Sequence, residues 1–118
     1  MTQFDFGNGP VPAHQHPNGG GWVADTTHVD ESAYVGSNAR VYDNAKVYDN
    51  AKIYGNARVF DNAQVFDNAW VYGRARVYGN ADVYGHAWVF DNARVFDNAQ
   101  VFDNAWVYGM PWQCSGHG

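Results

Sequence analysis

Valine or isoleucine returns every six residues through most of this 118-residue chain. The series runs from Val23 to Val107 without a slip, and from Val35 onward an alanine stands two positions before each member. A six-residue spacing drifts around an α-helix of about 3.6 residues per turn, and β-branched valine among repeated Asn and Gly is poor helix material. The pattern therefore excludes a helical repeat and requires a series of short extended segments.

The repeating unit reads Ala, x, Val, Tyr or Phe, Asp or Gly, Asn. Because successive side chains of a strand point to opposite faces, Ala and Val lie on one side, and x and the aromatic residue on the other. Asn and Gly tolerate the left-handed backbone conformation, and Asp or Asn can bond to its own backbone, so the last two positions supply a turn. Each unit is predicted to form one strand and one corner.

The exposed x position shows how many units make one coil. It reads Arg, Gln, Trp from residue 58, then Arg, Asp, Trp, then Arg, Gln, Trp up to residue 106, which is an eighteen-residue period. Strands this short become stable when coils stack and bond to the coils above and below. We therefore predict an all-β fold, a three-sided parallel β-helix (β-solenoid) of about five coils. Residues 56–73, repeated unchanged at 92–109, recur after two whole coils.

The array from about Val23 to Gly109 resembles the hexapeptide-repeat family, whose units read aliphatic, x, x, x, small, x. The resemblance implies a left-handed parallel β-helix of triangular cross-section and a trimeric assembly. The chain departs from the family by placing Tyr or Phe after the aliphatic residue, from Tyr42 to Tyr108. In this respect it looks more similar to uncharacterised Val-Tyr-Gly-Asn-Ala arrays of bacterial and phage proteins.

Folding the period onto three faces separates three kinds of surface. One carries lysine, glutamine or aspartate and is named the Gln face, and one carries an arginine in four successive coils and is named the Arg face. The third, the Trp face, is expected to be a flat aromatic surface. Its exposed rings are expected to be Trp70, Trp88, Trp106, Tyr72, Phe90 and Tyr108.

Exposed apolar patches larger than a few hundred Å² are rare on monomers, so the Trp face predicts self-association, with its three tryptophans as the main contact. Assembly side by side around a symmetry axis is expected, as a closed homo-oligomer such as a trimer or as a filament. Two alternatives stay open. The ladders could serve only to stiffen the solenoid, or the Trp row could stack on sugar rings in a glycan-binding module.

Both ends break the frame. Residues 1–21 are rich in Gly and Pro and predict an arm or cap, in which Phe4 and Phe6 cover the open Ala and Val end of the first coil. The solenoid itself is assigned to residues 22–109. A short tail follows at 110–118, where Pro111 cannot donate to a ladder and ends the array.

Histidine is the residue type that could carry chemistry here. His86 is the one histidine inside the regular array, in a corner that otherwise holds Asn, and a lone corner histidine is more typical of an Asn substitute than of a base. His14 and His16 form an H-x-H pair that could bind a metal with His28 as a third ligand, although Gly-rich surroundings impose little geometry. No catalytic constellation is found, so we expect a non-catalytic protein without cofactor. The rival is an acyltransferase-like or zinc-dependent enzyme with a site at a subunit boundary, as the resemblance implies.

Charge and composition narrow the partners. A net charge of −5 argues against a nucleic-acid or anionic-membrane binder, and no apolar run approaches the ~20 residues that span a bilayer. The N-terminus lacks the basic and then apolar layout of a signal peptide, so a cytoplasmic or virion-associated location is expected. The single cysteine, Cys114, has no partner for an internal disulfide.

Overall fold

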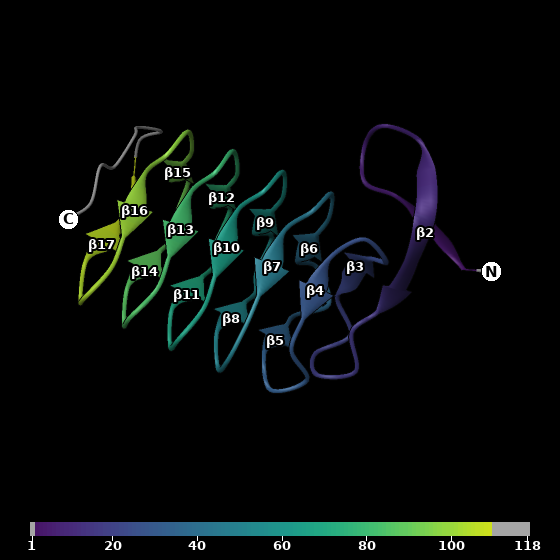
Figure 1. The fold of residues 1–118 in the computed structure, drawn as a ribbon, viewed down its shortest axis with the longest axis horizontal. Coiled ribbons are helices and arrows are strands. Elements are labelled where there is room, and N and C mark those ends of the chain that lie inside the picture. The colour runs from purple at the N-terminus through teal and green to yellow at the C-terminus, as the bar shows by residue number, and fades with distance from the viewer. Residues whose placement is uncertain (1, 110–118) are drawn as a thin grey trace.

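In the computed structural model, which describes residues 2–109, the chain winds as a parallel β-solenoid of five coils with three strands each (Figure 1). Coil one contains β3 (Trp22–Ala24), β4 (His28–Val29) and β5 (Tyr34–Val35). Coil two contains β6 (Arg40–Val41), β7 (Lys46–Val47) and β8 (Lys52–Ile53). Coil three contains β9 (Arg58–Val59), β10 (Gln64–Val65) and β11 (Trp70–Val71). Coil four contains β12 (Arg76–Val77), β13 (Asp82–Val83) and β14 (Trp88–Val89). Coil five contains β15 (Arg94–Val95), β16 (Gln100–Val101) and β17 (Trp106–Val107).

Each of these fifteen strands pairs with the strand eighteen residues away, which produces three parallel arrays of strands. The sheet order is β3-β6-β9-β12-β15 for the Arg face, β4-β7-β10-β13-β16 for the Gln face and β5-β8-β11-β14-β17 for the Trp face. The register places Arg58 beside Arg76, and Trp70 beside Trp88. The predicted all-β solenoid with three faces and about five coils is therefore confirmed, and the part of the chain between residues 2 and 109 contains no helix, so none that could cross a membrane.

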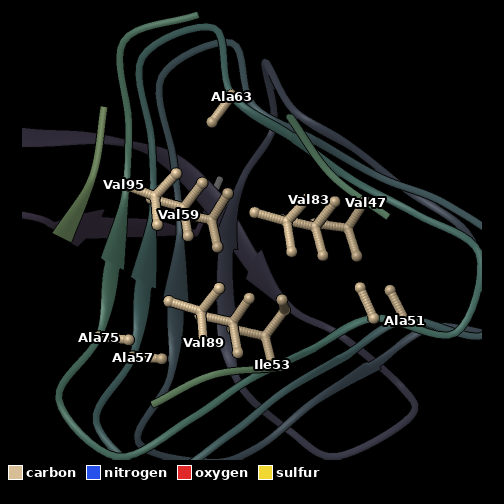
Figure 2. Close-up of a cluster of buried hydrophobic side chains, with 14 of the residues drawn as sticks. Val47, Ala51, Ile53, Ala57, Val59, Ala63, Ala75, Val83, Val89 and Val95 are labelled. Carbon is tan, nitrogen blue, oxygen red and sulfur yellow. The ribbon is translucent and has the colours of Figure 1, made fainter. Parts of the chain in front are cut away.

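The interior is narrow and consists of valine and alanine. Every member of the six-residue series from Val35 to Val107 is fully buried, and so are the alanines from Ala33 to Ala93. Figure 2 shows three rows of aliphatic side chains, one from each sheet, that point toward one another across the triangular section. Burying a valine side chain contributes about 1.5–3 kcal/mol, so this thin core stabilises the fold by repetition.

The corners differ from the prediction in one respect. Glycine takes the left-handed conformation as expected, with a φ of 67° at Gly79, but at the other corners the left-handed residue is the Asp, with a φ of 60° at Asp43, and not the Asn after it. In coils two and three the carboxylate of this aspartate reaches the next coil. The Asp43 Oδ2 accepts a bond from the Asp61 N–H at 3.3 Å, and the Asp61 Oδ2 accepts one from the Gly79 N–H at 3.1 Å.

The first residues form a hairpin of β1 (Gln3–Asp5) and β2 (Pro10–Gln15), and β2 pairs antiparallel with β3. Phe4 stacks on Trp22 and Phe6 stacks on Tyr42, each with ring centroids 4.9 Å apart. The expectation that these two rings cover the Ala and Val interior is therefore wrong: they prolong the outer aromatic ladders. The predicted tail, with Pro111 and Cys114, lies outside the described residues.

Candidate functional site on the Trp face

The tryptophans of the Trp face form one continuous stack. The ring centroids of Trp70 and Trp88 are 4.9 Å apart with planes 2° from parallel, and those of Trp88 and Trp106 are 5.3 Å apart at 1°. The parallel register of β11, β14 and β17 imposes this stack, because equivalent residues of neighbouring coils lie directly beside one another. Aromatic pairs of this kind contribute about 0.5–1.5 kcal/mol each beyond the area they bury.

A second stack runs beside it and meets it edge to face. Tyr72 stacks on Tyr54 at 4.8 Å and on Phe90 at 5.2 Å, while its ring stands at 71° to Trp70 and 73° to Trp88. Burial raises the pKa of Tyr54 and Tyr72, so both phenols stay neutral at physiological pH. The predicted flat aromatic sheet is thus an interlocked double ladder, because rings that stack along the axis cannot also lie flat on the surface.

The stacked rings remain partly exposed to solvent. Trp70 and Trp88 are half-buried, whereas Trp106 and Tyr108 are each 54% exposed. The aromatic surface is therefore most accessible in coil five.

A shallow groove of about 760 Å³ follows the Trp column on one side. Its far wall is the corner between the Gln face and the Trp face, where a side chain of Asn or His stands in each of coils two to five. These corner residues are Asn50, Asn68, His86 and Asn104. Lys52 closes one end, with its Nζ 5.5 Å from the centre of the Trp70 ring. The sequence analysis missed this polar column, because the corner Asn recurs about every six residues and its period does not single out the corner beside the tryptophans.

The structure gives each of the three candidate histidines before the regular array its own partner. His14 Nδ1 lies 2.7 Å from Asp25 Oδ1, and His28 Nε2 lies 2.8 Å from Asp30 Oδ1. His16 is only 3% exposed, with its Nε2 2.8 Å from the Ala33 carbonyl oxygen. The H-x-H pair is therefore not assembled with His28, and residues 2–109 hold no group of three or more His, Cys, Asp or Glu side chains arranged for a metal ion. His86 is exposed in its corner and lines the groove.

Part of the array matches a known repeat family. Residues 51–65 and 69–85, which lie in coils two to four, match the family model described as the YdcK beta solenoid repeat. Comparison with curated proteins and with solved structures finds no significant match. The chain is similar to that repeat in its β-solenoid fold.

The Arg face shows how a column of like charges is accommodated. The Arg40 guanidinium lies 4.8 Å from the centre of the Phe4 ring and donates to the carbonyl oxygens of Ser37 and Ala39. Burial, and then the neighbouring charge of Arg58, lower the pKa of Arg40. The hairpin therefore contributes a cation–π contact to the charge at this end of the column.

Asp82 provides a pH-dependent test of the Gln face, where it stands between Gln64 and Gln100. Burial raises the pKa of Asp82 above its ordinary value of 3.8, so the folded state favours the protonated carboxyl group. The stabilisation that comes from protonated Asp82 is fully present when the pH lies below the pKa of Asp82 in the unfolded chain. It is lost as the pH rises through the pKa of Asp82 in the folded protein. Asp82→Gln should therefore raise the melting temperature slightly at pH 7, and the gain should disappear below about pH 4. Thermal unfolding followed by circular dichroism at both pH values checks this, and an equal gain at both would contradict it.

Proposed function

We propose that the chain is a non-catalytic structural module, a rigid β-solenoid that associates with further copies of itself through the Trp face. The observation that carries the proposal is the distribution of exposed large hydrophobic residues. Among the described residues these are Val11, Tyr34, Trp106 and Tyr108, and the last three all lie on the Trp face. Leaving such rings in water is unfavourable, and a second copy would bury them.

The stacked coils support the structural part of the proposal. Each coil is bonded to its neighbours through three short ladders, and rings stack between neighbouring coils on all three faces. The result is a particle of 41 × 27 × 20 Å in which every coil reinforces the next. The finer expectations of a left-handed winding and of a trimer or filament rest on the resemblance to the hexapeptide-repeat family and belong to this proposal.

Replacing Trp70, Trp88 and Trp106 together by Ser tests the contact. The triple variant should keep its β-sheet circular dichroism, because the interior is unchanged, but should elute as a monomer of about 13.1 kDa in light scattering coupled to size exclusion. The matched control replaces Phe66, Tyr84 and Phe102 on the Gln face by Ser, which removes the same number of rings. An assembly that survives the Trp changes, or that is lost equally in the control, would sink the proposal.

The groove favours a second candidate function, the binding of a linear glycan. Carboxamide groups both donate and accept hydrogen bonds, as sugar hydroxyls require, and Asn50, Asn68 and Asn104, from coils two, three and five, stand beside the indole rings. Titration with soluble oligosaccharides, followed by tryptophan fluorescence, tests this function, with Asn68→Ala as the variant that should weaken binding. A titration without any change in fluorescence up to millimolar sugar would count against it.

The enzyme alternative has less support. A zinc or acyltransferase site would need His86 or the pair His14 and His16, and the pair is divided between Asp25 and the Ala33 carbonyl. Replacing His86 by Asn, the residue at the equivalent corners of coils two, three and five, should leave the fold intact and abolish any turnover that depended on His86. Self-association without turnover is therefore the function we favour.

A further inference from the structure

The first coil has no coil before it, yet its carbonyl groups are not left open. Inside the solenoid, two carbonyls of each strand accept bonds from backbone N–H groups of the preceding coil. On the Trp face, the Tyr34 N–H bonds to the Ala51 carbonyl at 3.0 Å and the Gly36 N–H to the Ile53 carbonyl at 2.8 Å. The equivalent carbonyls of coil one belong to Ala33 and Val35.

The N-terminal segment supplies both missing donors. His16 Nε2 lies 2.8 Å from the Ala33 carbonyl oxygen, and the Gly21 N–H donates to the Val35 carbonyl at 2.9 Å. The imidazole of His16 thus stands where a backbone N–H of a preceding coil would stand. Its burial to 3% exposure shows that this side chain belongs to the end of the solenoid and not to a mobile arm.

The Arg face is closed in a different way. Strand β2 pairs antiparallel with β3, so that Ala13 lies beside Ala24 and Gln15 beside Trp22. The Asp25 N–H adds a bond of 2.9 Å to the Pro12 carbonyl. A parallel strand of another coil cannot bond to an edge that β2 already occupies. Two of the three edges of coil one are therefore covered by residues 2–21, and β4 is left as an end strand.

The last coil of the described range is coil five, whose interior valines are as fully buried as those of the inner coils. Strands β15, β16 and β17 are each the last of their sheets within the described range. Ala105 is only partly buried, whereas its counterparts from Ala33 to Ala99 are buried, and Trp106 is 54% exposed. Moreover, the sequence of residues 92–109 in coil five is identical to that of residues 56–73 in coil three. In coil three, the strands formed by this sequence pair with the strands of coil four. Coil five is thus competent to carry a further coil.

We infer that residues 2–21 are an end cap that prevents a second copy of this chain from stacking its fifth coil on the first coil. Without the cap, β3, β4 and β5 would offer three parallel edges that match β15, β16 and β17 of the second copy. The backbone bonds formed would repeat those between coils within one molecule. Assemblies of such chains would lengthen along the solenoid axis. This end-to-end stacking is independent of the side-by-side contact proposed for the Trp face.

Removal of residues 1–21 tests the inference, in one variant that keeps residues 110–118 and in another that ends at Gly109. In light scattering, the mass of at least the variant ending at Gly109 should rise continuously with concentration, and electron microscopy should show rods that lengthen along one axis. The full-length chain should show no such growth. The same truncation with Trp70, Trp88 and Trp106 changed to Ser should still elongate, which separates stacking along the axis from lateral association.

A point variant covers the case in which the truncated chains fail to fold. His16→Ala removes one donor and loosens the cap in an otherwise complete chain, so its mass should shift upward by at least one whole chain at high concentration. His14→Ala is the matched control, because His14 lies two residues away and bonds to Asp25 instead. Folded truncated chains that keep the mass of the full-length protein would overturn the inference. If no truncated chain folds, a folded His16→Ala variant that behaves like His14→Ala would overturn it.

Discussion

Val65→Asp should abolish cooperative folding of the middle of the solenoid. Val65 is fully buried in coil three, where its side chain faces the valines of the other two sheets. An ionised carboxylate there has no cation to pair with and costs several kcal/mol after relaxation. Domains of this size are stable by about 5–15 kcal/mol in total, so the loss takes most of the available stability. Loss of β-sheet circular dichroism at 25 °C, or a melting temperature lower by more than about 15 °C, is the expected measurement.

The adjacent residue supplies the control. Gln64→Asp introduces the same side chain one position earlier, where it points outward next to Asp82 and repeats a residue that this column already contains. The change in stability should stay within about 1 kcal/mol, because the carboxylate remains hydrated and only a like-charge neighbour is added. Equal damage from the two substitutions would mean that Val65 does not face a dry interior.

Excision of residues 74–91 should leave a folded solenoid that is one coil shorter. The cut joins Gly73 to Asn92, which restores the six-residue unit and keeps Arg94 beside Arg58 and Trp106 beside Trp70. Because each coil contacts only its neighbours, the loss amounts to one coil and one interface. The variant should unfold in one cooperative transition and keep the strong near-ultraviolet circular dichroism of stacked tryptophans.

Excision of residues 74–88 removes three residues fewer than the 74–91 excision, but it should lower the stability of the solenoid far more. It places Val89 three positions after Val71, where a corner is needed, so coil five cannot stack on coil three. The three interior valines of coil five would then lose their partners, at about 1.5–3 kcal/mol each. A melting temperature lower by more than about 10 °C than that of the 74–91 excision is expected from thermal denaturation. If the variant without residues 74–88 were the more stable of the two, the six-residue frame would matter less to stability than the length of the chain.

The regular part of the fold could be predicted because every unit supplies its own evidence. Alternation between Ala and Val inside and x and aromatic residues outside decides which side is buried, and the recurrence of Trp70, Trp88 and Trp106 decides how many units close a coil. Both signals are local or strictly periodic, so no knowledge of tertiary contacts is needed.

The N-terminal segment could not be predicted in the same way, because it has no period. His16 looks like a polar residue in a Gly-rich stretch, and its burial depends on carbonyl groups of Ala33 that only the folded coil places beside it. The antiparallel pairing of β2 with β3 likewise has no counterpart in the parallel array. Such contacts are decided by tertiary structure, which a propensity or a spacing does not contain.

The candidate site was half predictable. Its residues followed from the period, but the orientation of the rings did not: that Trp70 and Tyr72 stand at 71° depends on side-chain packing between two columns. The sequence shows Asn50, Asn68 and Asn104, but only the structure shows that these side chains border the Trp column and form the polar wall of the groove.

The verbatim repeat gives the molecule an internal replicate. Val65 in coil three and Val101 in coil five are both fully buried and are flanked by the same letters on either side, but they lie at different depths along the axis. Val65 lies between the strands of coils two and four, whereas, in the part of the chain that the structure describes, Val101 has a paired strand only in coil four. The same substitution made at each site therefore keeps the local sequence constant and changes the number of neighbouring coils. In a linear array of coupled units, the difference in stability between the two variants reports on the coupling between neighbours.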